Sequence, residues 1–236
     1  MKVAIIVQAR IHSTRLPRKA LLDICGKTAL ERVVERCAKV ASADEVVVAC
    51  PKSDEVPIFE RTGIIAQTGP EHDLVTRLLN AARHVGADKF VRVTGDCPLI
   101  DPDVLQRCIS LSIVTKDNVI ANWIRRSYPN GMDCEVYDTR WFEQFSRREL
   151  SLTDREWFPV KIAKEEHVRN VEAAWDASSF RLTLDYVEDL TLLRQVQGAM
   201  GDSIWGWERI CLWLREHPKV LMLNAKYAKE TGGEIR

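Results

Sequence analysis

The apolar run Val3-Ala4-Ile5-Ile6-Val7 is followed directly by the stretch Gln8-Ala9-Arg10-Ile11-His12-Ser13-Thr14-Arg15-Leu16-Pro17-Arg18-Lys19. The apolar run predicts a buried parallel strand. Pro17 and the lack of apolar periodicity predict that the chain leaves this strand as a loop. Residues 1–22 contain five lysines and arginines and no acid. A basic loop at the carboxyl end of a first α/β strand favours phosphate binding over an ordinary solvated loop.

The composition excludes several classes of protein. A chain of 236 residues fits one large α/β domain, and Lys+Arg and Asp+Glu both number 34. Zero net charge favours neither nucleic acid nor an acidic membrane surface as partner, and no apolar run approaches the length of a membrane span. The seven cysteines show no zinc-like CxxC spacing, and no secretory segment precedes them. We therefore expect reduced thiols and a cytoplasmic location.

Strand and helix patterns alternate through the first hundred residues. We expect further strands at 45–50, 63–66 and 89–93. Helices are expected from about residue 28, over 54–61, and from 68–71 through about residue 84. This alternation with short connections predicts an α/β, Rossmann-like fold in which helices flank a mostly parallel sheet.

Acidic residues follow the strand at 89–93, in Thr94-Gly95-Asp96-Cys97-Pro98-Leu99-Ile100-Asp101-Pro102-Asp103. Asp101 before Pro102 predicts a helix N-cap, and Asp103 in the first turn suits the helix dipole. Asp96 has no such role, because it directly follows a strand and a glycine. We interpret Asp96 as a metal-site or phosphate-site residue at the carboxyl edge of the sheet. The alternative is an Asx-turn residue.

The pattern changes after residue 118. We expect strands at 118–122, 132–137, 168–171 and 180–184, the second of them half-exposed, and helices at 139–148 and 153–165. Asp185 stands between the strand at 180–184 and the next helix, where an N-cap is the default interpretation. We therefore predict a single domain over 1–236 with an inserted acceptor or dimerisation region at about 122–180.

Three motifs in the same order resemble a known family. They are Ile6-Val7-Gln8-Ala9-Arg10 with Ser13-Thr14-Arg15-Leu16-Pro17-x-Lys19, then Val93-Thr94-Gly95-Asp96-Cys97-Pro98-Leu99-Ile100, then Thr183-Leu184-Asp185-x-x-Glu188-Asp189-Leu190. Over at least residues 2–190 the chain is similar to cytidylyltransferases that activate acidic sugars, such as the CMP-ketodeoxyoctulosonate and CMP-sialate synthetases. It most resembles the spore-coat polysaccharide cytidylyltransferase-like branch.

The resemblance implies a glycosyltransferase-A-like fold and a homodimer that uses CTP, Mg²⁺ and an acidic acceptor in surface polysaccharide or glycoconjugate biosynthesis. It assigns Asp96 and Asp185 to the metal, and with Arg15 and Lys19 they form the expected catalytic set. The expected nucleotide-binding residues are Gln8, Ala9, Arg10, Ser13, Arg15, Lys19, Asp73, Arg77 and Gly95. The expected acceptor-binding residues are Asn122, Arg125, Gly131, Asp133, Glu135 and Arg181, with Arg126 a further candidate for a substrate carboxylate.

The expected reaction is attack by an acceptor oxygen on the α-phosphorus of CTP, with pyrophosphate as the leaving group. Arg15 and Lys19 would neutralise the outer phosphates. No residue identifies a general base. Departures from the family pattern are His12, Arg18, Asn130 and Trp157, the last in Arg155-Glu156-Trp157. Two alternatives remain: a glycosyltransferase that uses Asp101 and Asp103 as its metal pair, and a non-catalytic nucleotide-binding homologue.

Overall fold

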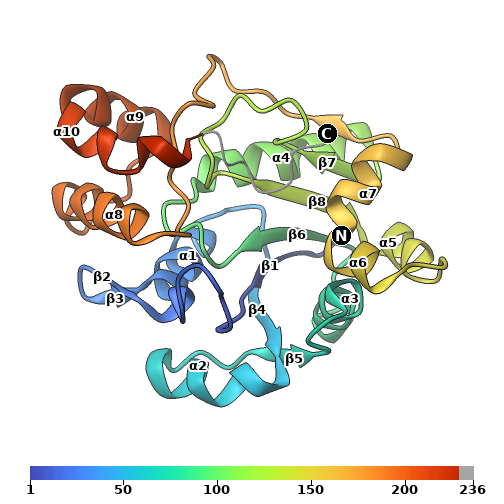
Figure 1. Ribbon diagram of the computed structural model, residues 1–236. Coiled ribbons are helices and arrows are strands. Elements are labelled where there is room, and N and C mark those ends of the chain that lie inside the picture. Colours follow the sequence, from blue (N-terminus) through green and yellow to red (C-terminus); the bar gives the residue numbers. More distant parts are fainter. Residues whose placement is uncertain (229–236) are drawn as a thin grey trace.

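The first strand, β1 (Val3–Gln8), lies between two parallel neighbours in a seven-stranded sheet (Figure 1). The computed structural model describes residues 1–228, and residues 229–236 of the predicted domain lie outside the described part. The strand order is β5-β4-β1-β6-β8-β7-β9, and only β8 runs antiparallel to its neighbours. The strands of this sheet are β1, β4 (Glu45–Pro51), β5 (Gln67–Gly69), β6 (Lys89–Thr94), β7 (Val119–Ala121), β8 (Cys134–Asp138) and β9 (Arg169–Asn170), and a separate hairpin joins β2 (Asp23–Ile24) to β3 (Lys27–Thr28).

Helices cover both faces of the sheet (Figure 1). Successive strand side chains point to opposite faces. Val3, Ile5 and Val7 of β1 accordingly join one buried cluster, and Ala4 and Ile6 join the other. The first cluster is completed by α1 (Ala29–Cys37), α4 (Pro102–Thr115), α8 (Val187–Met200) and α9 (Trp207–Glu216), and the second by α3 (Leu74–His84), α5 (Thr139–Ser146) and α7 (Phe158–Glu165). The remaining helices are α2 (Glu55–Thr62), α6 (Leu152–Glu156), α10 (Pro218–Leu221) and the 3-10 turns η1 (Lys19–Leu21), η2 (Lys52–Asp54) and η3 (Met222–Tyr227).

Polar caps fix where the helices begin. Thr28 and Glu31 form a reciprocal capping box at the start of α1. Asp101 caps α4 as predicted, because its carboxylate accepts from the backbone N–H of Asp103 at 2.8 Å and of Trp207 at 2.7 Å. The predicted fold class is confirmed: the sheet is mostly parallel and its two faces carry helices. Within residues 1–228, no helix is both long and apolar enough to cross a bilayer.

Two predicted elements near residue 65 are wrong. The strand expected at 63–66 is absent, and β5 covers Gln67–Gly69 instead. Gly63 ends α2 with a φ of 72°, and Ile65 is 80 % exposed, so this segment is a surface loop. The helix expected from 68–71 begins only at Leu74, because the side chain of Asp73 caps the N–H of Thr76.

Three further predictions after residue 118 need correction. The predicted half-exposed strand at 132–137 is β8, which lies between β6 and β7 and is buried. Its Glu135 pairs with Arg92 and is therefore not a solvated acid. The helix predicted at 153–165 is divided into α6 and α7 at Trp157. The strand predicted at 180–184 is an extended segment with an isolated bridge between Arg181 and Asn130.

Candidate active site

The carboxyl ends of β1 and β6 open into a cavity that collects much of the predicted machinery. Basic, acidic and aromatic side chains from both halves of the chain share its wall. The lining residues are Gln8, Ala9, Arg10, Arg15, Lys19, Ala20, Arg92, Thr94, Gly95, Asp96, Cys97, Trp123, Asn130, Asp133, Glu135, Glu156, Trp157, Pro159, Val160, Thr183 and Asp185.

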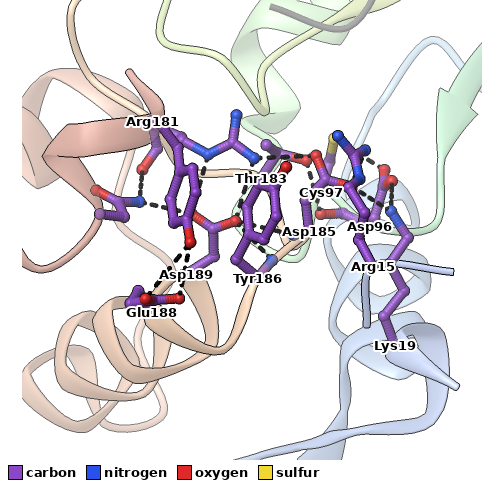
Figure 2. A network of polar contacts seen from close by, with 12 residues as sticks. Arg15, Lys19, Asp96, Cys97, Arg181, Thr183, Asp185, Tyr186, Glu188 and Asp189 are labelled. Carbon is purple, nitrogen blue, oxygen red and sulfur yellow. Dashed lines mark hydrogen bonds and ion pairs between the residues drawn. The ribbon is translucent and has the colours of Figure 1, made fainter. Parts of the chain in front are cut away.

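The basic loop after β1 is shaped by its own backbone contacts. The N–H of Ile11 donates to buried Asp54 at 2.7 Å, and the N–H of Arg18 donates to the carbonyl of Ile11 at 3.2 Å. Arg18 has a φ of 56°, a left-handed conformation that glycine adopts without strain. The next residue, Lys19, begins η1 and directs its side chain toward the acids (Figure 2). Arg18, one of the departures from the family pattern, thus falls at a position where glycine would be the less strained residue.

Lys19 joins the two acids that the sequence analysis assigned to the metal (Figure 2). Its ammonium donates to Oδ1 of Asp185 at 2.7 Å and also to Oδ2 of Asp96. Nη2 of Arg15 donates to the same Oδ1 of Asp185 at 2.7 Å. The side chains of Lys19 and Asp185 are each 12 % exposed. Two carboxylates and two cations therefore meet at one partly buried point.

Asp185 lies beside Asp96, but it does not follow a strand of the sheet as predicted. Asp185 follows an extended segment rather than a sheet strand, and the backbone N–H of Leu184 donates to the carbonyl of Asp96 at 2.8 Å. Helix α8 is not capped by the side chain of Asp185. The carboxylate of Asp189 instead accepts from the backbone N–H groups of Asp185 and Tyr186, at 2.9 and 3.0 Å. The side chain of Asp185 is left to contact cations.

The electrostatics keep this cluster charged. Burial acts to raise the pKa of Asp96, but the charge of Lys19 and hydrogen bonds from Lys19 and Thr94 outweigh it and lower the pKa to about 2. Burial acts to lower the pKa of Lys19, yet Asp96 and Asp185 outweigh it and raise the pKa. Lys19 is therefore an ammonium and Asp96 a carboxylate throughout the neutral range.

A second charged chain crosses the other half of the cavity. Arg92 donates from Nε to Gln8 at 2.8 Å and from Nη1 to both oxygens of Glu135, at 3.0 and 2.9 Å. The indole N–H of Trp123 donates to the same carboxylate at 2.6 Å. Burial raises the pKa of Glu135, although Arg92 and Trp123 act to lower it. Arg92 was missed by the sequence analysis, and its one signal was a charged residue inside an otherwise apolar strand.

Several predicted acceptor residues act on the backbone in this structure. Asn122 is buried, donates to the carbonyl of Met132 and accepts from the N–H of Cys134. Gly131 has a φ of 106°, and a Cβ there would lie 2.6 Å from the carbonyl carbon of Leu182. These two residues fix the turn that precedes β8.

Five of the predicted ligands lie outside the cavity lining, and four of these contact protein partners instead. Arg125 is exposed and pairs with Glu172 at 2.8 Å, and Arg126 makes two 2.6 Å contacts with Asp133. Asp73 caps α3, and buried Arg77 donates to the carbonyls of residues 70 and 71. Ser13 does not line the cavity either. Ligand binding by these residues stays a prediction.

The described residues contain no cluster of three or more His, Cys, Asp or Glu side chains suited to a metal ion. Asp96 and Asp185 both contact the ammonium of Lys19 in the cavity. Carboxylate oxygens are the ligands that Mg²⁺ prefers, and this ion commonly takes one or two carboxylates and completes its shell with phosphates and water. The donor set therefore fits a magnesium ion that arrives with a nucleotide.

Comparisons with known proteins identify the family. A family model described as Cytidylyltransferase matches residues 4–118. A 3-deoxy-manno-octulosonate cytidylyltransferase of Syntrophotalea carbinolica is 31 % identical over 184 residues, which cover 71 % of this chain and 73 % of the relative. A solved cytidylyltransferase structure from Leptospira borgpetersenii serovar Hardjo-bovis matches with a TM-score of 0.88 at 26 % identity, over 99 % of this chain and 100 % of that one.

The fold is also that of a solved CMP:2-keto-3-deoxy-manno-octonic acid synthetase complexed with CTP. The TM-score is 0.66 at 20 % identity, over 84 % of this chain and 99 % of that chain. The sequence match to the Syntrophotalea enzyme extends well beyond the basic loop and covers most of both proteins. This chain therefore belongs to the cytidylyltransferase family of CTP-dependent nucleotidyltransferases that includes the 3-deoxy-manno-octulosonate enzymes.

Proposed function

We propose that this enzyme moves CMP from CTP to an oxygen of an acidic sugar or related acidic acceptor and releases pyrophosphate. The observation that carries the proposal is the ammonium of Lys19 held between Asp96 and Asp185, with Arg15 beside it. Cations for the phosphates and acids for a metal thus meet at one point. The Syntrophotalea relative and the solved CMP:2-keto-3-deoxy-manno-octonic acid synthetase are named for an acidic sugar, which supports this class of acceptor. The setting that we propose is surface polysaccharide or glycoconjugate biosynthesis.

The basic loop supplies charge neutralisation. Pyrophosphate gains negative charge as it leaves, so preorganised cations at its oxygens stabilise the transition state. Arg15 and Lys19 are held on Asp185 before CTP binds, and phosphate oxygens then compete for both side chains. Reactive thiols are not needed for this step. Burial raises the pKa of the cavity thiol, Cys97, well above its ordinary value, so that thiol stays protonated.

Asp96 and Asp185 are the residues that would hold Mg²⁺. When bound, this ion would offset phosphate charge and lower the pKa of an attacking hydroxyl. Lys19 contacts both carboxylates, and phosphate oxygens and Mg²⁺ would compete with these contacts. We therefore propose that Lys19 serves both as the counter-ion of Asp96 and Asp185 and as a phosphate ligand.

The acceptor would lie against the half of the cavity formed by Trp123, Asn130, Asp133, Glu135 and Thr183. Arg92 lines this half, whereas Arg125 lies outside it. An acceptor carboxylate would compete with Glu135 for the guanidinium of Arg92. We propose Arg92 as the cation that meets the acidic group.

The glycosyltransferase alternative has no observation in its favour. Asp101 is 3 % exposed and its carboxylate accepts two backbone N–H groups, so the capping role accounts for it. Pyrophosphate release from CTP, measured over a panel of acidic sugars and phosphonates, tests the proposed function and the non-catalytic alternative together. We expect release that depends on both CTP and one class of acidic acceptor. Release with neutral sugars alone, or none with any acceptor, would contradict the proposal.

We also propose a homodimer whose interface includes part of residues 123–165. Exposed apolar side chains support this region, since Leu152 is 69 % and Trp157 54 % exposed. Light scattering at micromolar concentration should give a dimer, and Leu152→Glu should weaken it. A monomeric wild-type protein would contradict the assembly.

The seven cysteines are all unpaired, which supports a reducing, cytoplasmic setting for the reaction.

A further inference from the structure

A fully buried carboxylate, Asp189, lies behind Asp185 and outside the cavity wall (Figure 2). Besides the two backbone N–H groups at the start of α8, it accepts from Nε and Nη2 of Arg181 at 3.0 and 3.1 Å. Nη2 of Arg181 also donates to Oδ2 of Asp185 at 3.0 Å. Capping a helix requires only one of these contacts. Asp189 thus fixes Asp185 in two ways, through its backbone N–H and through Arg181.

Asn224 of η3 completes this arrangement from the far end of the described chain. Its side chain is buried, and Nδ2 donates to Oδ1 of Asp189 at 2.8 Å and to the carbonyl of Arg181 at 3.0 Å. Both contacts are made in a buried setting, where a lost donor leaves an acceptor without compensation from water. Asn224 therefore fixes both the carboxylate of Asp189 and the backbone of Arg181.

The same 3-10 turn supports the basic loop by a second contact. The ring of Tyr227 stacks on that of Tyr186 with centroids 3.8 Å apart and planes 7° apart. The guanidinium of Arg15 lies 5.3 Å from the centroid of Tyr186. Tyr227 of η3 therefore packs against Tyr186, and Tyr186 in turn contacts Arg15, which binds Asp185.

We propose that η3 is a positioning element of the active site and that Asn224 is its positioning residue. Asn224 orients Asp189 and Arg181, and these hold Asp185 so that its carboxylate faces the same cation as Asp96. The inference rests on the proposed function, because the metal role of Asp185 belongs to that proposal. It extends the site to a segment that forms no part of the cavity wall.

The test uses Asn224→Leu, which keeps the branched shape of the side chain and removes both donated hydrogen bonds. Lys226→Met is the matched control, because Lys226 lies on the same turn, pairs with Glu188 at an exposed position and lies over the ring of Tyr227, but has no described contact with Asp189, Arg181 or Asp185. Mn²⁺ binding is measured in the presence of CTP and without acceptor, and turnover is measured with acceptor. Asn224→Leu should weaken Mn²⁺ binding and lower kcat by about 10- to 100-fold, with the KM for CTP little changed. Lys226→Met should match the wild type.

Asn224→Asp gives a second readout that a loss of folding would not imitate. Its acid form can donate to Oδ1 of Asp189, whereas its ionised form repels that carboxylate. The kcat of Asn224→Asp relative to wild type should therefore rise as the pH is lowered. Wild-type Mn²⁺ binding and turnover in Asn224→Leu, or a flat relative kcat in Asn224→Asp, would overturn the positioning role. If the wild type itself neither bound Mn²⁺ with CTP nor released pyrophosphate, the proposed function would fail instead.

Discussion

Among single residues, Asp185 has the most cationic partners in the site: its carboxylate accepts hydrogen bonds from Arg15, Lys19 and Arg181. Lys19 also pairs with Asp96. We expect Asp96→Asn and Asp185→Asn to remain folded at pH 7 and each to lower turnover on the order of 10²-fold or more, the scale of one preorganised electrostatic contact. The double variant should lose much less than the product of the two losses, because residues that act as a unit are not additive. Steady-state turnover of all three variants, with thermal melts, checks this. A lower melting temperature with unchanged turnover in Asp185→Asn would reduce Asp185 to a structural residue.

Arg18 offers a test of backbone strain. Its φ of 56° suits glycine, whereas a Cβ in the left-handed region carries a steric cost. We expect Arg18→Gly to be about 1 kcal/mol more stable to unfolding than Arg18→Ala, the reverse of their order inside a helix. Urea unfolding of both variants measures the difference. If Arg18→Ala is the more stable of the two, the left-handed conformation at this position is incorrect.

At the scale of elements, the loop from β1 to η1 carries the cations proposed for the outer phosphates. Arg15→Ala and Lys19→Ala should therefore weaken CTP far more than CMP, because CMP lacks the β- and γ-phosphates. Calorimetric titration of both ligands makes the comparison, and Lys27→Ala, which removes an exposed cation paired with Glu35, is the control. Equal losses for CTP and CMP would mean that the loop shapes the fold or the base pocket instead.

Elements with strong local signals were predictable from the sequence. The apolar run at 3–7 and the Asp101-Pro102 start of α4 needed no tertiary information. The segment at 180–184 reads as a strand by its alternation, yet tertiary contacts leave it extended with a single bridge. β8 has the sequence pattern of an exposed strand because its Glu135 is neutralised by Arg92, a partner 43 positions away. The alternation of apolar and polar residues within a strand carries no information about a charged partner that is far away in the sequence.

The candidate site was predictable where a motif marked it and not where a partner did. Lys19, Asp96 and Asp185 stand in motifs, and the structure brings them into contact. Asn224 and Arg92 stand in none, and their roles come from buried contacts with distant residues. Such contacts form only in the folded protein, and no local sequence pattern predicts them.

At the scale of the whole molecule, the Lys19–Asp96 pair ties stability to pH. In the folded protein the pKa of Asp96 is lowered from 3.8 to about 2. The ionised carboxylate therefore stabilises the fold at any pH above the pKa that Asp96 has in the unfolded chain. This stability, about 2 kcal/mol, should be complete above pH 5 and lost as the pH falls from about 4 toward 2. Urea unfolding of wild type and Asp96→Asn across this range measures it. The advantage of the wild type at pH 7 should shrink toward zero near pH 2, and an advantage independent of pH would contradict the pairing.

The identity of the nucleotide matters most for the proposed reaction, because the contacts among residues 1–228 bring together the residues proposed for phosphate and metal but identify no side chain that reads a base. Isothermal titration of CTP, UTP, ATP and GTP, each with Mg²⁺, measures the preference for CTP directly. We predict that CTP binds at least about tenfold more tightly than ATP or GTP, roughly 1.4 kcal/mol. Equal affinity for all four nucleotides would contradict it.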